Sequence, residues 1–100
     1  MSAPSPRSVL QRHRSPRVEH VEVDGEVVAF DTESGALHLL DPLATVIWNL
    51  LDGSATLLET SDDLAAAVGR PAEEMLPLVL ELAGRLEDLA LVHRVAQGPA

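Results

Sequence analysis

Residues 18–40 read VEHVEVDGEVVAFDTESGALHLL, and this stretch decides the fold. Its first six residues alternate in polarity with a period of two and are rich in valine, a pattern that indicates a β-strand. Asp24-Gly25 then predicts a two-residue hairpin turn, because glycine reaches positive φ without strain. A second turn is expected at Asp31–Gly35. The meander of antiparallel strands that results comprises Val18–Val23, Glu26–Phe30 and Ala36–Leu40.

The first helix is expected from about Pro42 to Asp52. Asp41 offers a side-chain acceptor for the N-cap, and Pro42 fits the first helical position, where its missing N–H costs nothing. Gly53 is a natural stop at the other end.

Two more helices follow. Thr60 can cap the second, which would end at Gly69, although residues 56–59 (TLLE) also fit a capping box, and this boundary stays open. The third runs from Pro71 to about Ala90, with apolar residues at three- and four-residue steps. Pro77 either starts this helix or kinks it.

A chain of 100 residues forms one domain at most. Residues 1–17 contain three prolines, four serines and four arginines, so we expect a flexible basic N-terminal arm. The folded domain should span residues 18–94, and residues 95–100 should form a frayed C-terminus. The fold class predicted from these elements is α+β, a three-stranded antiparallel sheet followed by three helices.

The net charge of −9 hides a division between the arm and the body. Residues 1–17 carry +4, residues 18–100 carry −13, and the chain has no lysine. An acidic body repels a phosphate backbone, and a helix that reads DNA needs Arg or Lys on its surface. We therefore expect no nucleic-acid partner, because the third helix carries mainly acidic residues, namely Glu73, Glu74, Glu81, Glu87 and Asp88.

The sequence offers no motif for catalysis. There is no cysteine, the four histidines lack metal-ligand spacing, and neither a Gly-x-Ser-x-Gly elbow nor a glycine-rich phosphate loop is present. We expect no enzyme activity, no cofactor and no metal. The chain also lacks an apolar run of membrane-spanning length and a secretory signal, so no membrane association and a cytoplasmic location are expected.

The third predicted strand, Ala36–Leu40, ends the meander and has one free edge. Its residues are apolar or neutral, and such an edge promotes aggregation unless something covers it. The cover can be the C-terminus of the chain, the same edge of a second copy in a homodimer, or a peptide that adds as a further strand.

Residues 31–53, DTESGALHLLDPLATVIWNLLDG, resemble the PqqD-like family. The usual family pattern is a strand ending in Leu-Asn or Leu-Asp, then Pro-x-Ala, a buried Ile-Trp and a closing Asp-Gly. The resemblance extends over Val18 to Val92. It implies a fold similar to a winged helix-turn-helix with the hairpin at the front, in which Leu40, Ala44, Ile47, Trp48 and Leu86 belong to the core.

The resemblance also implies a function. Members of the family are recognition elements for ribosomally synthesised, post-translationally modified peptides in natural product biosynthesis, lasso peptides among them. Such a domain, without chemistry of its own, acts as a peptide chaperone. It binds the leader segment of a precursor by β-strand addition and presents it to a separate modifying enzyme or leader peptidase. The alternatives are a winged-helix transcription-associated protein and an edge-strand homodimer without a peptide ligand.

The resemblance carries specific contacts over to this sequence. The backbone of the third strand would pair with the leader, and three residues of the third helix would line the opposite wall of a groove. Arg85 would then meet an acidic leader residue, although pairing with Glu81 or Asp88 is an equally open interpretation. The peptide-binding residues predicted in this way are Ala36, Leu37, His38, Leu39, Leu40, Leu78, Leu82 and Arg85.

Overall fold

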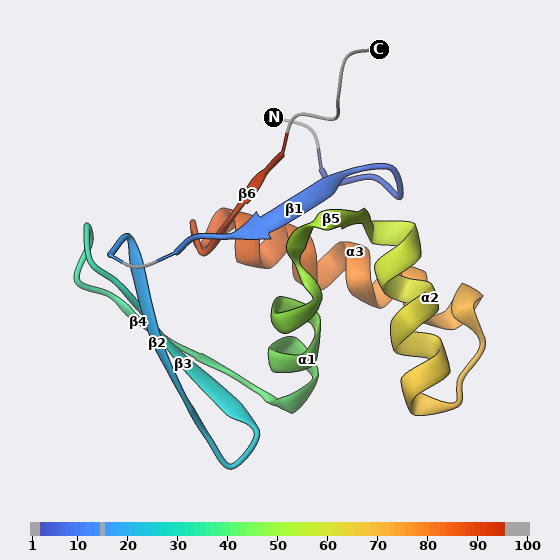
Figure 1. Ribbon diagram of the computed structural model, residues 1–100, viewed down its shortest axis with the longest axis horizontal. Coiled ribbons are helices and arrows are strands. Elements are labelled where there is room, and N and C mark those ends of the chain that lie inside the picture. The colour runs from blue at the N-terminus through green and yellow to red at the C-terminus, as the bar shows by residue number, and fades with distance from the viewer. Residues whose placement is uncertain (1–2, 15, 96–100) are drawn as a thin grey trace.

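The computed structural model describes residues 3–14 and 16–95. These residues form an α+β fold with three helices and antiparallel strands in two sheets (Figure 1). One sheet has the strand order β2-β3-β4 and the other β5-β1-β6. The elements are β1 (Val9–Arg12), β2 (Val18–Val23), β3 (Glu26–Asp31), β4 (Leu37–Leu40), α1 (Pro42–Leu50), β5 (Asp52–Thr56), α2 (Leu57–Val68), α3 (Ala72–Asp88) and β6 (Val92–Arg94).

The predicted meander is confirmed. β2, β3 and β4 pair antiparallel in chain order, and their ends differ by no more than one residue from the expected strands. Asp24 and Gly25 both have positive φ, at 52° and 79°, as a two-residue turn of the hairpin type requires. The pattern of residues 18–23 and the two turns predicted this sheet from local sequence alone, and in β3 the buried and less buried side chains alternate as a strand with one face on the core requires.

The expectation of a flexible arm over residues 1–17 is wrong for Val9–Arg12. These four residues form β1, the central strand of the second sheet, and Leu10 is fully buried. The strand exists because β5 and β6, both far along the chain, supply backbone partners on its two sides. The predicted frayed C-terminus began at residue 95. Val95 is instead held in place, because its N–H donates a hydrogen bond to Val9 O at 2.8 Å. Residues 96–100 lie outside the described residues.

α1 begins as predicted and ends earlier than predicted. Asp41 caps it, since its carboxylate accepts a hydrogen bond from Ala44 N at 2.8 Å. The helix ends at Leu50, and the chain turns at once into β5, so Gly53 lies inside a strand instead of stopping a helix. Gly53 has a φ of +84°, and a Cβ there would lie 3.1 Å from the side chain of Gln11 on β1.

α2 starts at the earlier of the two predicted positions. Thr56 Oγ1 accepts from Glu59 N at 3.1 Å and the Glu59 carboxylate accepts from Thr56 N at 2.8 Å, which is a complete capping box. Thr60 is therefore a buried residue of the helix and not its cap. α3 continues without interruption through Pro77, whose ring lies on an exposed position.

The buried side chains form one cluster between the sheets and the helices. The five residues expected in the core are all at most 6 % exposed, which confirms them; they are Leu40, Ala44, Ile47, Trp48 and Leu86. All three helices and the second sheet lie on one side of the β2-β3-β4 sheet, and no element of the described residues covers its other side (Figure 1). No helix in the described part of the chain is long and apolar enough to cross a membrane.

Candidate functional site

The outer edge of β4 is available for pairing. Within residues 3–14 and 16–95, β4 pairs with β3 alone and forms the end of its sheet. Leu37 and Leu39 are 68 % and 71 % exposed, whereas His38 is half-buried and Leu40 is buried. An apolar edge strand with this much exposed side chain is the form of edge that a further strand can extend.

Backbone hydrogen bonds identify which residues of β4 face outward. Ala36 O accepts from Asp31 N at 2.9 Å, and Leu40 O accepts from the Thr45 hydroxyl at 3.2 Å, so both groups point toward the β3 side. Direction alternates along a strand, and the N–H and C=O groups of Leu37 and Leu39 therefore point away from β3. Of the five residues predicted here, these two carry the free backbone groups.

Asp31 fixes the turn that leads into β4. Its carboxylate accepts hydrogen bonds from Glu33 N at 3.0 Å and Ser34 N at 3.4 Å, and it forms an ion pair with Arg17. Burial raises the pKa of this carboxyl, but the hydrogen bonds from residues 33 and 34 and from Arg17 outweigh burial and hold the pKa below its ordinary value of 3.8. The turn is thus tied to the segment before β2.

The predicted residues of α3 share one side of the helix. Leu78, Leu82 and Arg85 recur at four- and three-residue steps, which places them in one row. The opposite side of α3 faces β6 and the N-terminal segment, because the Glu87 carboxylate binds Arg94 at 2.8 Å and Gly84 lies against Pro4. The row is therefore directed away from β6.

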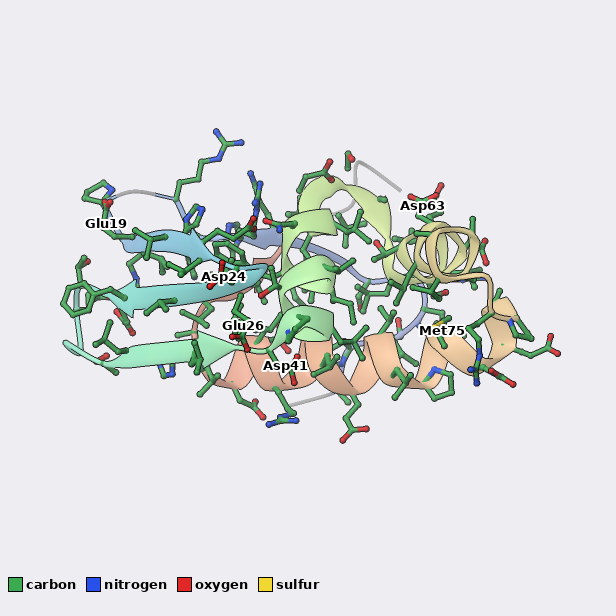
Figure 2. All side chains as sticks on the ribbon, turned by 90° about the horizontal axis from the view of Figure 1, so that it is seen from below. Glu19, Asp24, Glu26, Asp41, Asp63 and Met75 are labelled. Carbon is green, nitrogen blue, oxygen red and sulfur yellow. The ribbon has the colours of Figure 1, made fainter. Side chains whose placement is uncertain are left out.

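This row and the β4 edge lie on the same side of the molecule. Both views place β4 and the C-terminal end of α3 on the far side of α1 from α2, and Figure 2 shows the two elements at the same level (Figures 1 and 2). α1 packs against both elements and separates them. Leu78 is 38 % exposed, Leu82 is half-buried against the core, and Arg85 is exposed.

Arg85 is the cation of this region. None of the ion pairs within the described residues involves it, so the pairing with Glu81 or Asp88 that the sequence left open is not found. Leu89, 40 % exposed, extends the same row toward the end of the helix.

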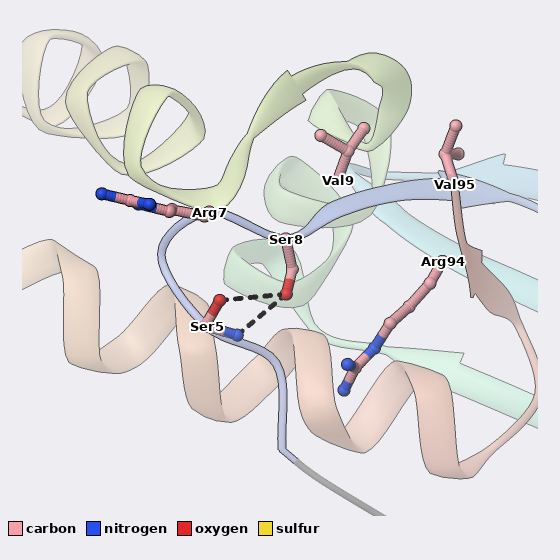
Figure 3. Close-up of a pocket in the computed structure, with 6 residues that line it drawn as sticks. All are labelled: Ser5, Arg7, Ser8, Val9, Arg94 and Val95. Atoms are coloured by element: carbon pink, nitrogen blue, oxygen red, sulfur yellow. Dashed lines mark hydrogen bonds between the residues drawn. The ribbon is translucent and has the colours of Figure 1, made fainter. Parts of the chain in front are cut away.

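The hollows elsewhere do not suggest a reaction centre. One pocket of about 250 Å³ lies between the N-terminal segment and β6, where Ser5 and Ser8 bond each other (Figure 3). A larger hollow beside the C-terminal end of α3 contains the His13 and His93 rings, whose centroids are 4.7 Å apart. Among residues 3–14 and 16–95, no group of three or more acidic or histidine side chains is placed to hold a metal ion.

Comparison with known proteins gives a fold relative and a family. A solved structure titled "TbiB1 in Complex with the TbiA(beta) Leader Peptide" superposes with a TM-score of 0.73 at 22 % sequence identity, covering 87 % of this chain and 99 % of that one. No curated protein matches the chain. The family described as "Coenzyme PQQ synthesis protein D (PqqD)" matches residues 26–92. That match covers both the β4 edge and the row on α3, and this chain is therefore a member of the PqqD family.

Proposed function

We propose that this protein is a non-catalytic recognition domain for the leader segment of a ribosomally made precursor peptide. The leader adds as a strand to the free edge of β4, and the domain presents it in the cytoplasm to a separate modifying enzyme or leader peptidase. The single observation that carries the proposal is the β4 edge itself, where Leu37 and Leu39 are exposed and direct their backbone groups outward. Family membership and the fold relative bound to a leader peptide support it.

Strand addition explains the arrangement of side chains around the edge. Alternate residues of an added strand would point to the side of the sheet that carries His38 and Leu40, and α3 lies on that side. There, Leu78 and Leu82 offer apolar contacts, and Arg85 offers a positive charge that no ion pair among the described residues engages. Backbone pairing would supply affinity and these side chains specificity.

Titration of labelled leader peptides by fluorescence anisotropy tests the proposal. The peptides are those of the precursor genes that neighbour this gene, and one of them should bind saturably. Leu39→Asp should weaken that binding about tenfold or more, because it places a charge in the new apolar contact. Leu58→Asp, at a 46 % exposed leucine of α2, is the matched control and should bind as the wild type does.

Two outcomes would contradict the proposal. One is the failure of every neighbouring leader to bind at high micromolar concentration. The other is a β4 edge paired with that of a second copy, which size-exclusion chromatography with light scattering would reveal as a dimer that Leu39→Asp dissociates. A role in transcription is disfavoured by the acidic residues of α3, since DNA binding depends on positive charge.

A further inference from the structure

The uncovered side of the β2-β3-β4 sheet is apolar. Register places Val21 beside Val28 and Val28 beside Leu39, while Phe30 pairs with Leu37 on the same side. The intervening residues of β3, such as Val27 and Ala29, point to the other side of the sheet and are buried in the core. We call this side the outer face, and it consists of Val21, Val23, Val28, Phe30, Leu37 and Leu39.

The outer face is accessible to a partner. Five of its six residues are exposed, from 37 % at Phe30 to 71 % at Leu39, with Val21 at 59 % and Val23 at 57 %, whereas Val28 in the middle of the face is half-buried. All other elements of the fold lie on the opposite side of the sheet (Figure 1). Contiguous apolar surface of this kind on a small soluble domain marks an interaction site, because leaving it in water is unfavourable.

The charged residues that β2 and β3 place on the outer face are both acidic. Glu19 and Glu26 lie on this side of the sheet by register, and Asp24 occupies the β2–β3 turn. Figure 2 shows Glu19 at one end of the sheet and the other two at the opposite end. No arginine or lysine occurs between residues 18 and 69. Two copies meeting through this face would place acid against acid, so the complementary surface is one that carries basic residues.

The outer face is continuous with the free edge of β4 to which the leader is proposed to add, which we call the leader edge. Leu37 and Leu39 belong to both, and a strand added to β4 would direct alternate side chains to this side. From the exposed apolar area, its acidic rim and this continuity, we infer that the outer face docks the enzyme that acts on the bound precursor. The contact surface of that enzyme is apolar and ringed by arginine or lysine. The identity of the partner rests on the proposed function.

Binding to purified enzymes tests the inference. The modifying enzyme and the leader peptidase encoded beside this gene are immobilised, and the affinity of the full chain is measured by biolayer interferometry at low and high salt. One of them should bind the wild type, and Val21→Glu should weaken that binding about tenfold or more. Higher salt should also weaken it, since the rim pairs are exposed. Val68→Glu, at a 49 % exposed valine at the end of α2, should bind normally.

Measuring leader affinity in parallel separates this inference from the proposed function. Val21 lies on β2, two strands away from the leader edge, so Val21→Glu should bind leader peptide as the wild type does. Loss of enzyme binding with leader binding intact supports the docking surface. Enzyme binding that depends on Val21 without any leader binding supports the surface and contradicts the proposed function.

Three results would overturn the inference. The first is equal enzyme affinity of the Val21→Glu and Val68→Glu variants. The second is the absence of enzyme binding by the wild type. The third is a wild-type dimer that Val21→Glu converts to a monomer, which would assign the outer face to a second copy. Thermal unfolding followed by circular dichroism verifies that both variants are folded, as expected for two exposed positions.

Discussion

Thr45 of α1 accepts a hydrogen bond from Val27 N of β3 at 2.9 Å, in the buried interior. The same hydroxyl donates to Leu40 O at 3.2 Å, so it bridges the ends of β3 and β4 where those two residues pair. One side chain of the helix thereby fixes the position of β4 and its free edge. Removal of this hydroxyl would leave the Val27 N–H without an acceptor and the Leu40 C=O without a donor.

Thr45→Val should therefore lower the free energy of unfolding by about 1–3 kcal/mol, the cost of buried polar groups left without partners. Thr45→Ser retains the hydroxyl and should lose less, which makes it the matched control. Urea denaturation measures both. Equal stability of the valine variant and the wild type would show that the bridge contributes nothing.

A proline at position 39 tests strand addition directly. The Leu39 N–H points away from β3, so Leu39→Pro removes a donor that β3 does not use, and edge strands tolerate proline with this orientation. The variant should fold and should lose leader binding by about tenfold or more. His38→Pro is the contrasting variant, because residue 38 directs its N–H toward β3 and its loss should destabilise the domain. Leader titration and thermal unfolding distinguish the two, and wild-type leader affinity of the Leu39→Pro variant would exclude pairing at this edge.

The Arg85 guanidinium forms no ion pair within the described residues and lies in the row of α3 beside β4. Arg85→Ala should weaken leader binding about tenfold, since a charge-assisted hydrogen bond to a leader carboxylate is lost. Stability should change by no more than about 0.5 kcal/mol. Arg70→Ala is the control, because Arg70 already pairs with Glu74 and lies at the other end of the helix. Equal leader affinities of the two variants would contradict the role of Arg85.

The sheet that carries the leader edge could be predicted from the sequence, and the second sheet could not. β2, β3 and β4 are neighbours along the chain, so their alternation and their turns are local signals. β1 has only four residues and pairs with strands about 40 and 80 residues away. β5 (DGSAT) contains a glycine and a capping threonine, which locally indicate a helix end and a helix start. Their pairing is a property of the tertiary fold.

The site shows the same division. The free edge of Ala36–Leu40 followed from the position of this strand at the end of the meander, its apolar character from its composition, and the row on α3 from the family resemblance. The outward direction of Leu37 and Leu39 depends on the hydrogen bonds of Ala36 and Leu40, which no sequence pattern specifies. The outer face was also missed, because alternation shows that one side of a strand is apolar without showing that the other side is apolar too.

Ala90 follows the C-cap of α3 in a backbone conformation that favours glycine. Its φ is +59°, in the left-handed region, just after the C-cap of α3. Ala90→Gly should raise the free energy of unfolding by about 1 kcal/mol, because glycine has no Cβ to strain there. The same substitution at the exposed position 66 in the last turn of α2, Ala66→Gly, should lower it by at most about 1 kcal/mol. Chemical denaturation of the two variants measures whether the free energy of unfolding rises or falls in each. A lower stability of Ala90→Gly would contradict backbone strain at Ala90.

Stability should depend on pH through His13. Burial lowers the pKa of its imidazole, and the nearby His93 and Arg17 lower it further, against smaller opposing effects of Asp31 and Glu33. The folded state therefore takes up a proton less readily than the unfolded state, where histidine titrates near 6.5. By linkage, stability is complete above pH 6.5 and declines as the pH falls through that value toward the folded pKa. Asp31 affects stability separately, because its pKa is below 3.8 in the folded state and the stability it contributes is lost only as the pH falls below that value.

His13→Gln should flatten this part of the profile, because glutamine does not titrate. Denaturation at a series of pH values from about 7.5 to about 5.5 compares the variant with the wild type. An NMR titration of the His13 ring protons provides the second measurement and should give a midpoint below 6.5. A midpoint above 6.5 would reverse the sign of the linkage, because the folded state would then bind the proton more tightly than the unfolded state and acid would stabilise the fold.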